Sequence, residues 1–268
     1  YHVEFVEDRP VVQESAWALI VNGRACVTFL CTPEKLSYLA VGFLANEGLI
    51  AGPDDVVSLE IDSGKDTIHV RLRPDLTGLR RPVRSESITF DDLAGDFTPL
   101  NSHQFVTPPQ VIGLMDAMLN GAVKYRETRG LHCSALADRE GLLALAEDVG
   151  RHNTLDKIRG KCLARGIQTK NRILLTTARL SSEMLGKAVR MGTPVVISRS
   201  SPTDLSVRLA RRWGKTIIGY VSGNQMSVYA GRERVRGNLS VEASAHRVSG
   251  LSALNTHLEL EPGARFYP

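Results

Sequence analysis

Short apolar segments alternate with amphipathic helical segments between Leu131 and Tyr220, and this alternation restricts the fold more than any other feature of the chain. Strands that are separated by helices usually pair in parallel and carry helices on the faces of their sheet. The sequence therefore predicts an α/β domain with parallel strand pairing. Its predicted elements are strands at 134–136 and 142–146, a helix near 153–164, a strand at 172–177, a helix at 182–191, a strand at 194–198, a helix at 203–213 and a strand at 215–220.

The amino-terminal part has a different pattern, which predicts a smaller α+β domain. Apolar runs within residues 3–31 are broken at Asn22-Gly23, a dipeptide typical of tight hairpin turns. Thr32-Pro33 is a helix start signal, and Gly48 is the matching stop. Two further strands are predicted within 56–72, and a second helix opens at Thr107-Pro108. The predicted division is an amino-terminal domain with connector loop at 1–107, the α/β domain at 108–230, and an extension at 231–268.

Composition excludes several classes of protein. Of the 268 residues, 43% are apolar, and the net charge is +4 with 33 basic residues that are mostly scattered. Such a distribution favours a modest anion-binding surface over a dedicated nucleic-acid-binding protein. No apolar run approaches the roughly 20 residues of a membrane span, and the first residues lack the features of a signal peptide. We therefore expect no membrane or nucleic-acid partner and a cytoplasmic location.

Hydroxyl and arginine side chains gather after two predicted strands, at the point where each strand ends. One cluster is Thr176, Thr177, Arg179, Ser181 and Ser182, and the other is Ser198, Arg199, Ser200, Ser201 and Thr203. In α/β sheets, ligands collect at the carboxyl ends of the strands, beside helix N-termini that attract anions. The clusters predict one phosphate-binding crevice. The alternative is simple helix capping by Ser182 and by Ser201 or Thr203, which explains one hydroxyl per helix but not the remaining ones.

A stretch from Gly130 to Lys157 is unusually rich in groups that carry chemistry. His132, Cys133, Glu147, Asp148, Arg151 and His152 lie at the edges of apolar segments. Asp148 and His152, four residues apart, are spaced for a general acid/base pair on a helix. We favour a binding role, with Asp148 as a helix N-cap and Arg151 paired with Glu147 or with a phosphate. Cys26 and Cys162 are interpreted as small buried hydrophobic residues.

Several motifs resemble the FdhD/NarQ family of formate dehydrogenase accessory sulfurtransferases. The most specific is Glu147-Asp-Val-Gly-Arg-His-Asn-Thr-Leu-Asp-Lys, and the others begin at Asn22, Leu39, Ser181 and Ser198. Proteins similar to this one take sulfur from a cysteine desulfurase and deliver it to the molybdenum or tungsten bis-molybdopterin guanine dinucleotide cofactor, for use by a formate dehydrogenase apoenzyme. The resemblance also implies a homodimer, and a cytidine deaminase-like three-layer α/β/α domain beside the smaller α+β domain.

The resemblance and the strand-end clusters together define the predicted site. GDP is the expected analogue of the bound cofactor, and no metal ligand is predicted. The predicted cofactor-binding residues are Arg151, His152, Thr177, Arg179, Ser181, Ser198, Ser200, Thr203, Tyr220, Val221, Ser222, Gly223, Asn224 and Gln225, and the predicted catalytic residues are Cys133 and His132.

The chain departs from the family at the sulfur-carrying cysteines, which stand in a Cys-x-x-Cys loop. Here that loop reads Arg80 to Phe90 and contains no cysteine. Cys133 is the remaining thiol in the predicted crevice, where nearby cations would lower its pKa, and we treat it as a candidate persulfide carrier. Two alternatives stay open: an inert, packed Cys133, and a non-catalytic protein that binds the cofactor without moving sulfur. A zinc-dependent deaminase is disfavoured, because the His-x-Glu turn and the Pro-Cys-x-x-Cys ligand pair are absent.

Overall fold

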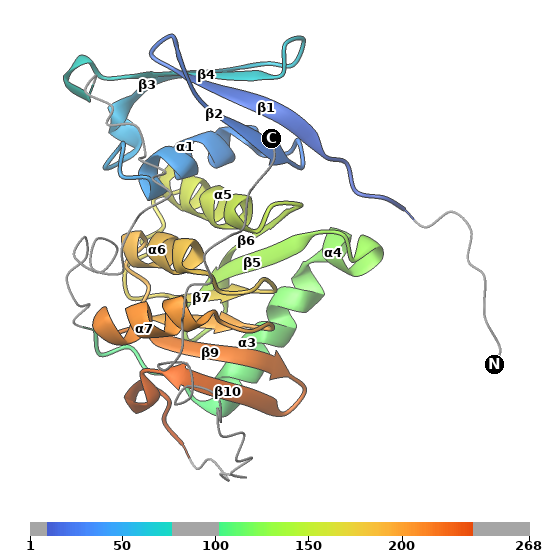
Figure 1. The fold of residues 1–268 in the computed structure, drawn as a ribbon, viewed down its shortest axis with the longest axis vertical. Helices are drawn as coiled ribbons and strands as arrows, with labels where there is room; N and C mark the ends of the chain where they lie inside the picture. The colour runs from blue at the N-terminus through green and yellow to red at the C-terminus, as the bar shows by residue number, and fades with distance from the viewer. Residues whose placement is uncertain (1–9, 77–101, 238–268) are drawn as a thin grey trace, which may run out of the picture. The chain divides into compact units, whose positions relative to one another are not determined.

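Two mixed β-sheets and six α-helices form the part of the chain that the computed structural model describes, residues 10–76 and 102–237 (Figure 1). The first sheet has strand order β2-β1-β4-β3, and the second has order β10-β9-β8-β7-β5-β6. The strands and helices are β1 Ser15–Val21, β2 Arg24–Cys31, α1 Leu36–Asn46, β3 Val56–Asp62, β4 Thr67–Leu72, α3 Pro108–Gly121, α4 Val123–Thr128, β5 His132–Ala137, β6 Leu142–Asp148, α5 Arg151–Ala164, β7 Ile173–Thr176, α6 Ser182–Arg190, β8 Val195–Ser198, α7 Asp204–Arg212, β9 Thr216–Ser222 and β10 Gln225–Ala230.

The predicted amino-terminal hairpin is confirmed. Strands β1 and β2 pair antiparallel around Asn22 and Gly23, whose φ angles of 49° and 76° suit a two-residue hairpin turn. The Asn22 side chain also accepts a hydrogen bond from the main-chain N–H of Leu72, at 2.8 Å. That bond joins the turn to β4, the strand that pairs in parallel with β1.

Helix α1 packs on the first sheet through the apolar residues that its periodicity predicts, but it starts later than expected. Thr32 is not its N-cap: the helix begins after Lys35, which has a left-handed φ of 54°. The Thr32 hydroxyl instead accepts a hydrogen bond from the N–H of Val149, at 3.2 Å. The local sequence signal predicts that Thr32 caps the helix, but its hydroxyl instead bonds to Val149, which is distant in the sequence. Gly48, with φ 74°, follows the helix as predicted.

The second sheet is only partly parallel, so the predicted parallel pairing holds for some of its strands and not for others. Strands β7, β8 and β9 are parallel, and a helix separates each from the next. Strand β5 pairs antiparallel with both β6 and β7, and β10 pairs antiparallel with β9. The reason is that β5–β6 and β9–β10 are joined by short turns, and a short turn reverses the chain direction.

Helices cover both faces of the second sheet. Leu136, Leu174 and Val196 belong to the hydrophobic core that α5, α6 and α7 share with the sheet. Helix α3 contacts β5, β6, β7 and β9, and Figure 1 shows it on the side away from α6 and α7. Its predicted start is confirmed, since Thr107 caps it and forms a reciprocal capping box with Gln110.

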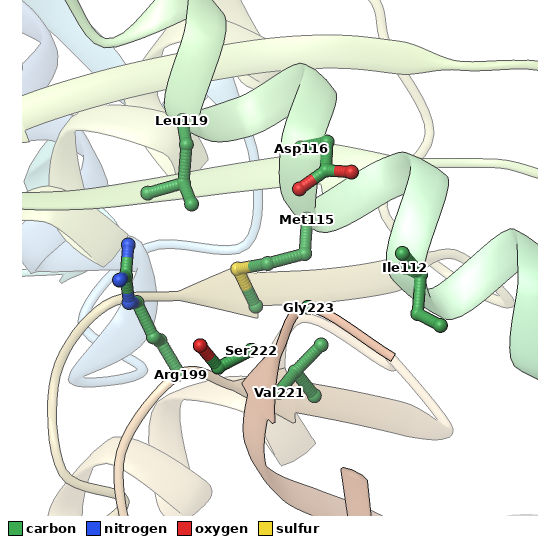
Figure 2. A pocket seen from close by; sticks show the side chains of 8 residues that line it. All are labelled: Ile112, Met115, Asp116, Leu119, Arg199, Val221, Ser222 and Gly223. Carbon is green, nitrogen blue, oxygen red and sulfur yellow. The ribbon is translucent and has the colours of Figure 1, made fainter. Parts of the chain in front are cut away.

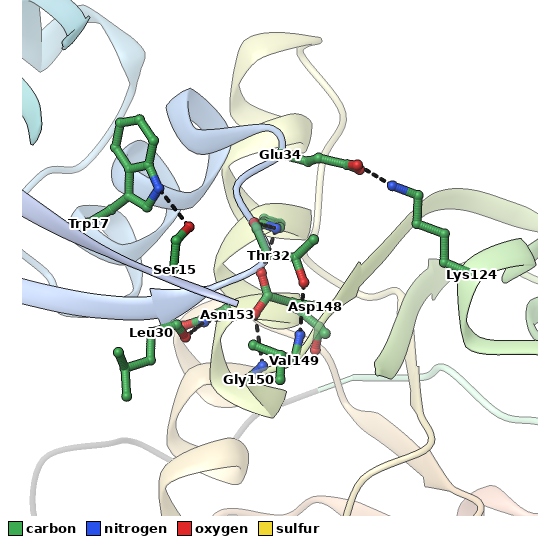
Figure 3. Close-up of polar contacts among 12 residues, drawn as sticks. Ser15, Trp17, Leu30, Thr32, Glu34, Lys124, Asp148, Val149, Gly150 and Asn153 are labelled. Carbon is green, nitrogen blue, oxygen red and sulfur yellow. Dashed lines mark hydrogen bonds and ion pairs between the residues drawn. The ribbon is translucent and has the colours of Figure 1, made fainter. Parts of the chain in front are cut away.

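A close helix crossing joins the two halves of the described chain. At Gly42 of α1, an added Cβ would lie 1.7 Å from the carbonyl oxygen of Asp156 in α5. Beside the crossing, buried Lys157 lies 2.5 Å from the Asp148 carboxylate and donates to the Thr32 carbonyl at 3.0 Å. Figure 3 shows Asn153 bonded to the Leu30 carbonyl and Thr32 bonded to Val149 in the same region. These contacts fix the start of α5, where the family motif lies.

Some predictions fall outside the described residues. The connector containing Arg80 to Phe90 lies within residues 77–101, and most of the predicted extension lies within residues 238–268. The domain boundaries at residues 107 and 230 therefore stay predictions.

Candidate functional site

Strand register brings the predicted site segments to one edge of the second sheet. Ser134 near the start of β5 faces Thr176 at the end of β7, and Thr176 faces Ser198 at the end of β8. The N–H of Tyr220 then donates to the carbonyl oxygen of Ser200, at 3.1 Å. His132, the first residue of β5, pairs with Asp148, the last residue of β6. The segments that the sequence assigns to one crevice therefore do lie next to one another.

Hydroxyl groups at this edge are already bonded within the protein. The Thr177 hydroxyl accepts the Cys133 N–H at 3.0 Å, and the Thr177 N–H donates to the Cys133 carbonyl at 2.9 Å. Ser198 is fully buried, and its hydroxyl donates to the Ala178 carbonyl at 2.7 Å while accepting the Ser200 N–H at 2.9 Å. These groups shape the loops that follow the strands.

Two of the predicted cofactor-binding hydroxyls cap helices. The Ser181 hydroxyl accepts the N–H of Met184 at the start of α6, and the Thr203 hydroxyl accepts the N–H of Ser206 at the start of α7. The predicted cap at Thr203 is confirmed, and Ser201 is not a cap. The cap predicted at Ser182 is wrong by one position, because Ser181 caps α6. Both helix starts lie next to the strand-end edge, where their free N–H groups favour a negatively charged ligand.

Cys133 does not have the lowered pKa that the sequence suggests. Its side chain has no exposed surface, and burial, followed by the nearby Glu147 carboxylate, raises the pKa of the thiol to about 12. The prediction failed because Cys133 points into the sheet's packed interior, whereas the neighbouring His132 is half-buried at the edge. Burial and Arg151 lower the pKa of His132, so its ring is neutral at pH 7 and supplies no positive charge to the thiol.

The other three cysteines also have raised pKa values. Burial raises the pKa of Cys31 and of Cys162 to about 11, and both side chains are fully buried. Cys26 is half-buried, and burial together with Glu47 raises the pKa of its thiol. All four cysteines of the chain lie in the described residues. None is a thiolate near neutral pH.

The motif at the start of α5 is organised differently from its sequence interpretation. Asp148 is not the N-cap residue, which is Gly150, although its carboxylate accepts the Gly150 N–H at 2.8 Å. It pairs with Lys157 and not with His152. His152 Nε2 instead lies 3.1 Å from the Glu183 carboxylate, and burial lowers the pKa of the ring. The favoured role of Asp148 as N-cap is therefore wrong, and the alternative Asp148–His152 acid/base pair does not form either.

Among the described residues, Arg151 does not form the ion pair with Glu147 that the sequence suggested. The Glu147 carboxylate accepts the N–H of Tyr125, at 2.6 Å. The Arg151 Nε atom is buried without a hydrogen-bond partner among residues 10–76 and 102–237. This Nε–H donor is therefore unused by the described residues, and a phosphate or carboxylate is the kind of group that would accept its hydrogen bond.

The segment from Tyr220 to Gln225 forms the end of β9, the turn and the start of β10. Tyr220 has a left-handed φ of 52° and is 53% exposed. A bulky residue in this conformation stores backbone strain, which concentrates at functional sites. An added Cβ at Gly219 would lie 3.0 Å from the Ser200 carbonyl oxygen, so glycine permits the close approach of β9 to the preceding loop.

A pocket of about 220 Å³ opens between α3 and the end of β9 (Figure 2). Val221, Ser222 and Gly223 line it on one side and Arg199 on another. The predicted cofactor segment therefore reaches a cavity. Helix α3 contributes Ile112, Met115, Asp116 and Leu119.

Sequence reasoning missed the contribution of α3 to this pocket. It predicted only that a helix opens at Thr107-Pro108, and it gave no role to Asp116. Residues 112, 115, 116 and 119 share one helix face by their spacing, but the sequence gives no sign that the β9–β10 turn lies opposite that face. An exposed carboxylate beside an apolar stripe was the only available signal.

Two further features of the described residues bear on the class of site. Within the described ranges, no group of three or more His, Cys, Asp and Glu side chains is arranged to hold a metal ion. None of the helices in the described part of the chain combines the length and apolar character that crossing a membrane requires.

Comparison with known proteins identifies the family. The FdhD/NarQ family profile matches residues 12–236. The sulfur carrier protein FdhD of Bacillus subtilis (strain 168) is 35% identical over 243 residues, covering 86% of this chain and 92% of that protein. The FdhD protein of Staphylococcus haemolyticus (strain JCSC1435) is 34% identical over 235 residues, covering 84% and 89%. A crystal structure described as a formate dehydrogenase accessory protein, from Desulfotalea psychrophila, matches with TM-score 0.70 and 27% identity, covering 83% and 90%. The resemblance in the motifs is thus confirmed, and the chain belongs to the FdhD/NarQ family.

Proposed function

We propose that this protein binds the molybdenum or tungsten bis-molybdopterin guanine dinucleotide as cargo during maturation of a formate dehydrogenase. The observation that carries the proposal is the convergence of the start of β5 with the ends of β7, β8 and β9 at one sheet edge, with a pocket at the β9 end. An elongated ligand with phosphates suits a row of strand ends and helix N-termini.

The charged groups at this edge fit such a cargo. Arg179 and Arg199 are exposed, and neither guanidinium forms an ion pair within the described residues. A guanidinium binds phosphate through two parallel N–H donors. The N-termini of α6 and α7 contribute further main-chain N–H groups beside the two arginines. Arg179 and Arg199 are therefore the side chains that we expect to hold the diphosphate.

We further propose that the chain binds its cargo without carrying sulfur on a cysteine of its own. Sulfur uptake from a cysteine desulfurase needs a thiolate that attacks the outer sulfur of the desulfurase persulfide and releases the desulfurase thiolate. All four thiols here have raised pKa values. Burial thus works against this reaction at every cysteine in the chain.

Sulfur transfer is the second candidate function, and the relatives named sulfur carrier proteins favour it. In that case a cysteine must become exposed when partners bind. Cys133 lies closest to the strand-end edge, and Cys26 is the one that keeps some exposed surface. We also propose as partners a cysteine desulfurase, a formate dehydrogenase apoenzyme and a second copy of the chain. The cytoplasmic location and the cytidine deaminase-like layering of the second domain remain part of this proposal.

Two measurements test the proposed function. Calorimetric titration with GDP should give saturable binding, and ADP should bind more weakly because the cargo carries guanine. Absence of any heat of binding with GDP would contradict the cargo site.

Mass spectrometry after incubation with a cysteine desulfurase and cysteine tests the sulfur question separately. We expect no cysteine to gain a sulfur atom, because none is a thiolate near neutral pH. A family member with the Cys-x-x-Cys loop serves as the positive control. A gain of one sulfur on Cys133 or Cys26 would establish the carrier function instead.

A further inference from the structure

The pocket between α3 and the β9–β10 turn has walls that suit a flat ring. Ile112, Met115 and Leu119 on α3 face Val221 on β9 across the cavity (Figure 2). Aliphatic and thioether side chains pack well against the faces of aromatic rings. The volume of about 220 Å³ is below the range of roughly 300–1,000 Å³ that is usual for drug-sized ligands. The pocket is therefore suited to one ring system and not to a whole dinucleotide.

One carboxylate stands among these apolar side chains. Asp116 lies on the same face of α3 as Ile112, Met115 and Leu119, and Figure 2 shows it beside the cavity. In the described part of the chain, its carboxylate makes no hydrogen bond or ion pair within the protein. An ionised carboxylate only accepts hydrogen bonds. The pocket should therefore favour a ring that carries two neighbouring N–H donors on the side that faces Asp116.

We propose that Asp116 recognises the guanine base of the cargo, an inference that rests on the proposed function and names its specificity residue. Guanine presents its ring N1–H and its exocyclic N2 amine side by side, and both can donate to the two oxygens of one carboxylate. Adenine has an unprotonated N1 at the equivalent position, which would face the carboxylate as a second acceptor. Asp116 therefore favours guanine and disfavours adenine.

Arg199 gives the bound nucleotide a direction. Its guanidinium lines the same pocket, and in Figure 2 it lies on the other side of Met115 from the Asp116 carboxylate. The N–H of Arg199 donates to the Thr176 carbonyl at 3.0 Å, which holds the residue at the ends of β7 and β8. A base that contacts Asp116 would thus place its phosphates toward Arg199 and the strand-end edge.

Replacing the Asp116 carboxylate by an amide should weaken the binding of one nucleotide and strengthen the binding of another. Xanthine keeps the N1–H of guanine but has a carbonyl oxygen in place of the N2 amine. In Asp116→Asn, the side-chain oxygen can accept from N1–H while the amide donates to that carbonyl. We expect GDP affinity to fall at least about tenfold and xanthosine diphosphate to become the preferred ligand over GDP. Calorimetric titration of both nucleotides against both proteins measures this reversal.

A matched control separates the specific effect from a general loss of charge. Asp54 is exposed in the short turn before β3 and does not line the pocket. Asp54→Asn should leave the preference for GDP unchanged. If Asp116→Asn binds GDP within about twofold of the unmodified protein and gains nothing for xanthosine diphosphate, the guanine assignment is wrong. If the unmodified protein binds no GDP, the proposed function itself has failed. The two failures are thus distinguishable.

Discussion

Single side chains at the strand-end edge differ in whether the protein already uses their polar atoms. Thr177 and Ser198 are bonded to main-chain groups, and Ser198 has no exposed surface. Arg179 and Arg199 are exposed without ion pairs in the described ranges. Ligand affinity at this edge should therefore depend on the arginines, while the hydroxyls maintain the loops that present them.

The position of each arginine along the edge leads to a prediction. Neighbouring strands are about 4.8 Å apart, so Arg151 beside β5 lies roughly 10 Å along the sheet from β8. We expect Arg199→Ala to weaken GDP binding at least about tenfold, or 1.4 kcal/mol, because it would remove one of the two guanidinium groups proposed to hold the diphosphate. Arg151→Ala should cost less than about threefold with GDP, since Arg151 would contact the distant part of the larger cargo.

Calorimetric titration of the two variants checks this order, with Arg126→Ala on α4 as an exposed arginine control outside the pocket. A larger loss in Arg151→Ala than in Arg199→Ala would move the diphosphate to the β5 end.

The sequence predicted which residues converge here, because motif and strand ends are local features. It did not predict that the Ser198 hydroxyl is occupied by Ala178, since that partner is 20 residues away.

Among the helices, the α1–α5 crossing has the tightest geometric requirement. An added Cβ at Gly160 of α5 would lie 2.0 Å from the Tyr38 carbonyl oxygen in α1. Because main-chain atoms cannot move aside cheaply, Gly160→Ala must separate the helices. We expect it to lower the free energy of unfolding by about 3 kcal/mol or more, as measured by urea unfolding followed by circular dichroism.

Gly186→Ala in α6 is the matched control, since nothing lies within 4 Å of the added Cβ. That variant should gain up to about 1 kcal/mol from helix propensity. Equal stability of Gly160→Ala and the unmodified protein would show that the helices can separate without cost.

Periodicity predicted both helices from the sequence. The crossing could not be predicted, because a glycine within a helix does not reveal which helix approaches it.

The relative directions of the strands in the second sheet show which parts of the topology can be predicted from local sequence patterns. Helices between β7, β8 and β9 predicted their parallel pairing correctly. The antiparallel pairing of β5, β6 and β10 depends on the length of the turns that join the strands and on which strands lie next to one another in the sheet. The same strand order brings the start of β5 next to the end of β7, so the family motif, which pairs with the start of β5, reaches the strand-end edge only because the β5–β7 pairing is antiparallel.

Stability of the whole molecule should depend on pH through Lys215, a fully buried lysine before β9. Its Nζ donates to the carbonyl of Ala188 at 3.4 Å and to that of Thr193. Burial, with a smaller effect from Arg234, lowers the pKa of Lys215 to about 7. An unfolded lysine has a pKa of about 10.4. Between these values the unfolded chain binds one proton more than the folded chain, so stability rises with pH.

This effect should amount to about 2 kcal/mol between pH 7 and pH 9. The raised thiol pKa values act in the opposite direction, but only as the unfolded thiols ionise near pH 9 and above. Urea unfolding of the unmodified protein and of Lys215→Met across this range isolates the lysine, since every other group titrates in both. We expect Lys215→Met to be more stable at pH 7, and its advantage to shrink by about 2 kcal/mol at pH 9. Parallel stability curves would mean that the two carbonyls keep Lys215 charged in the folded protein.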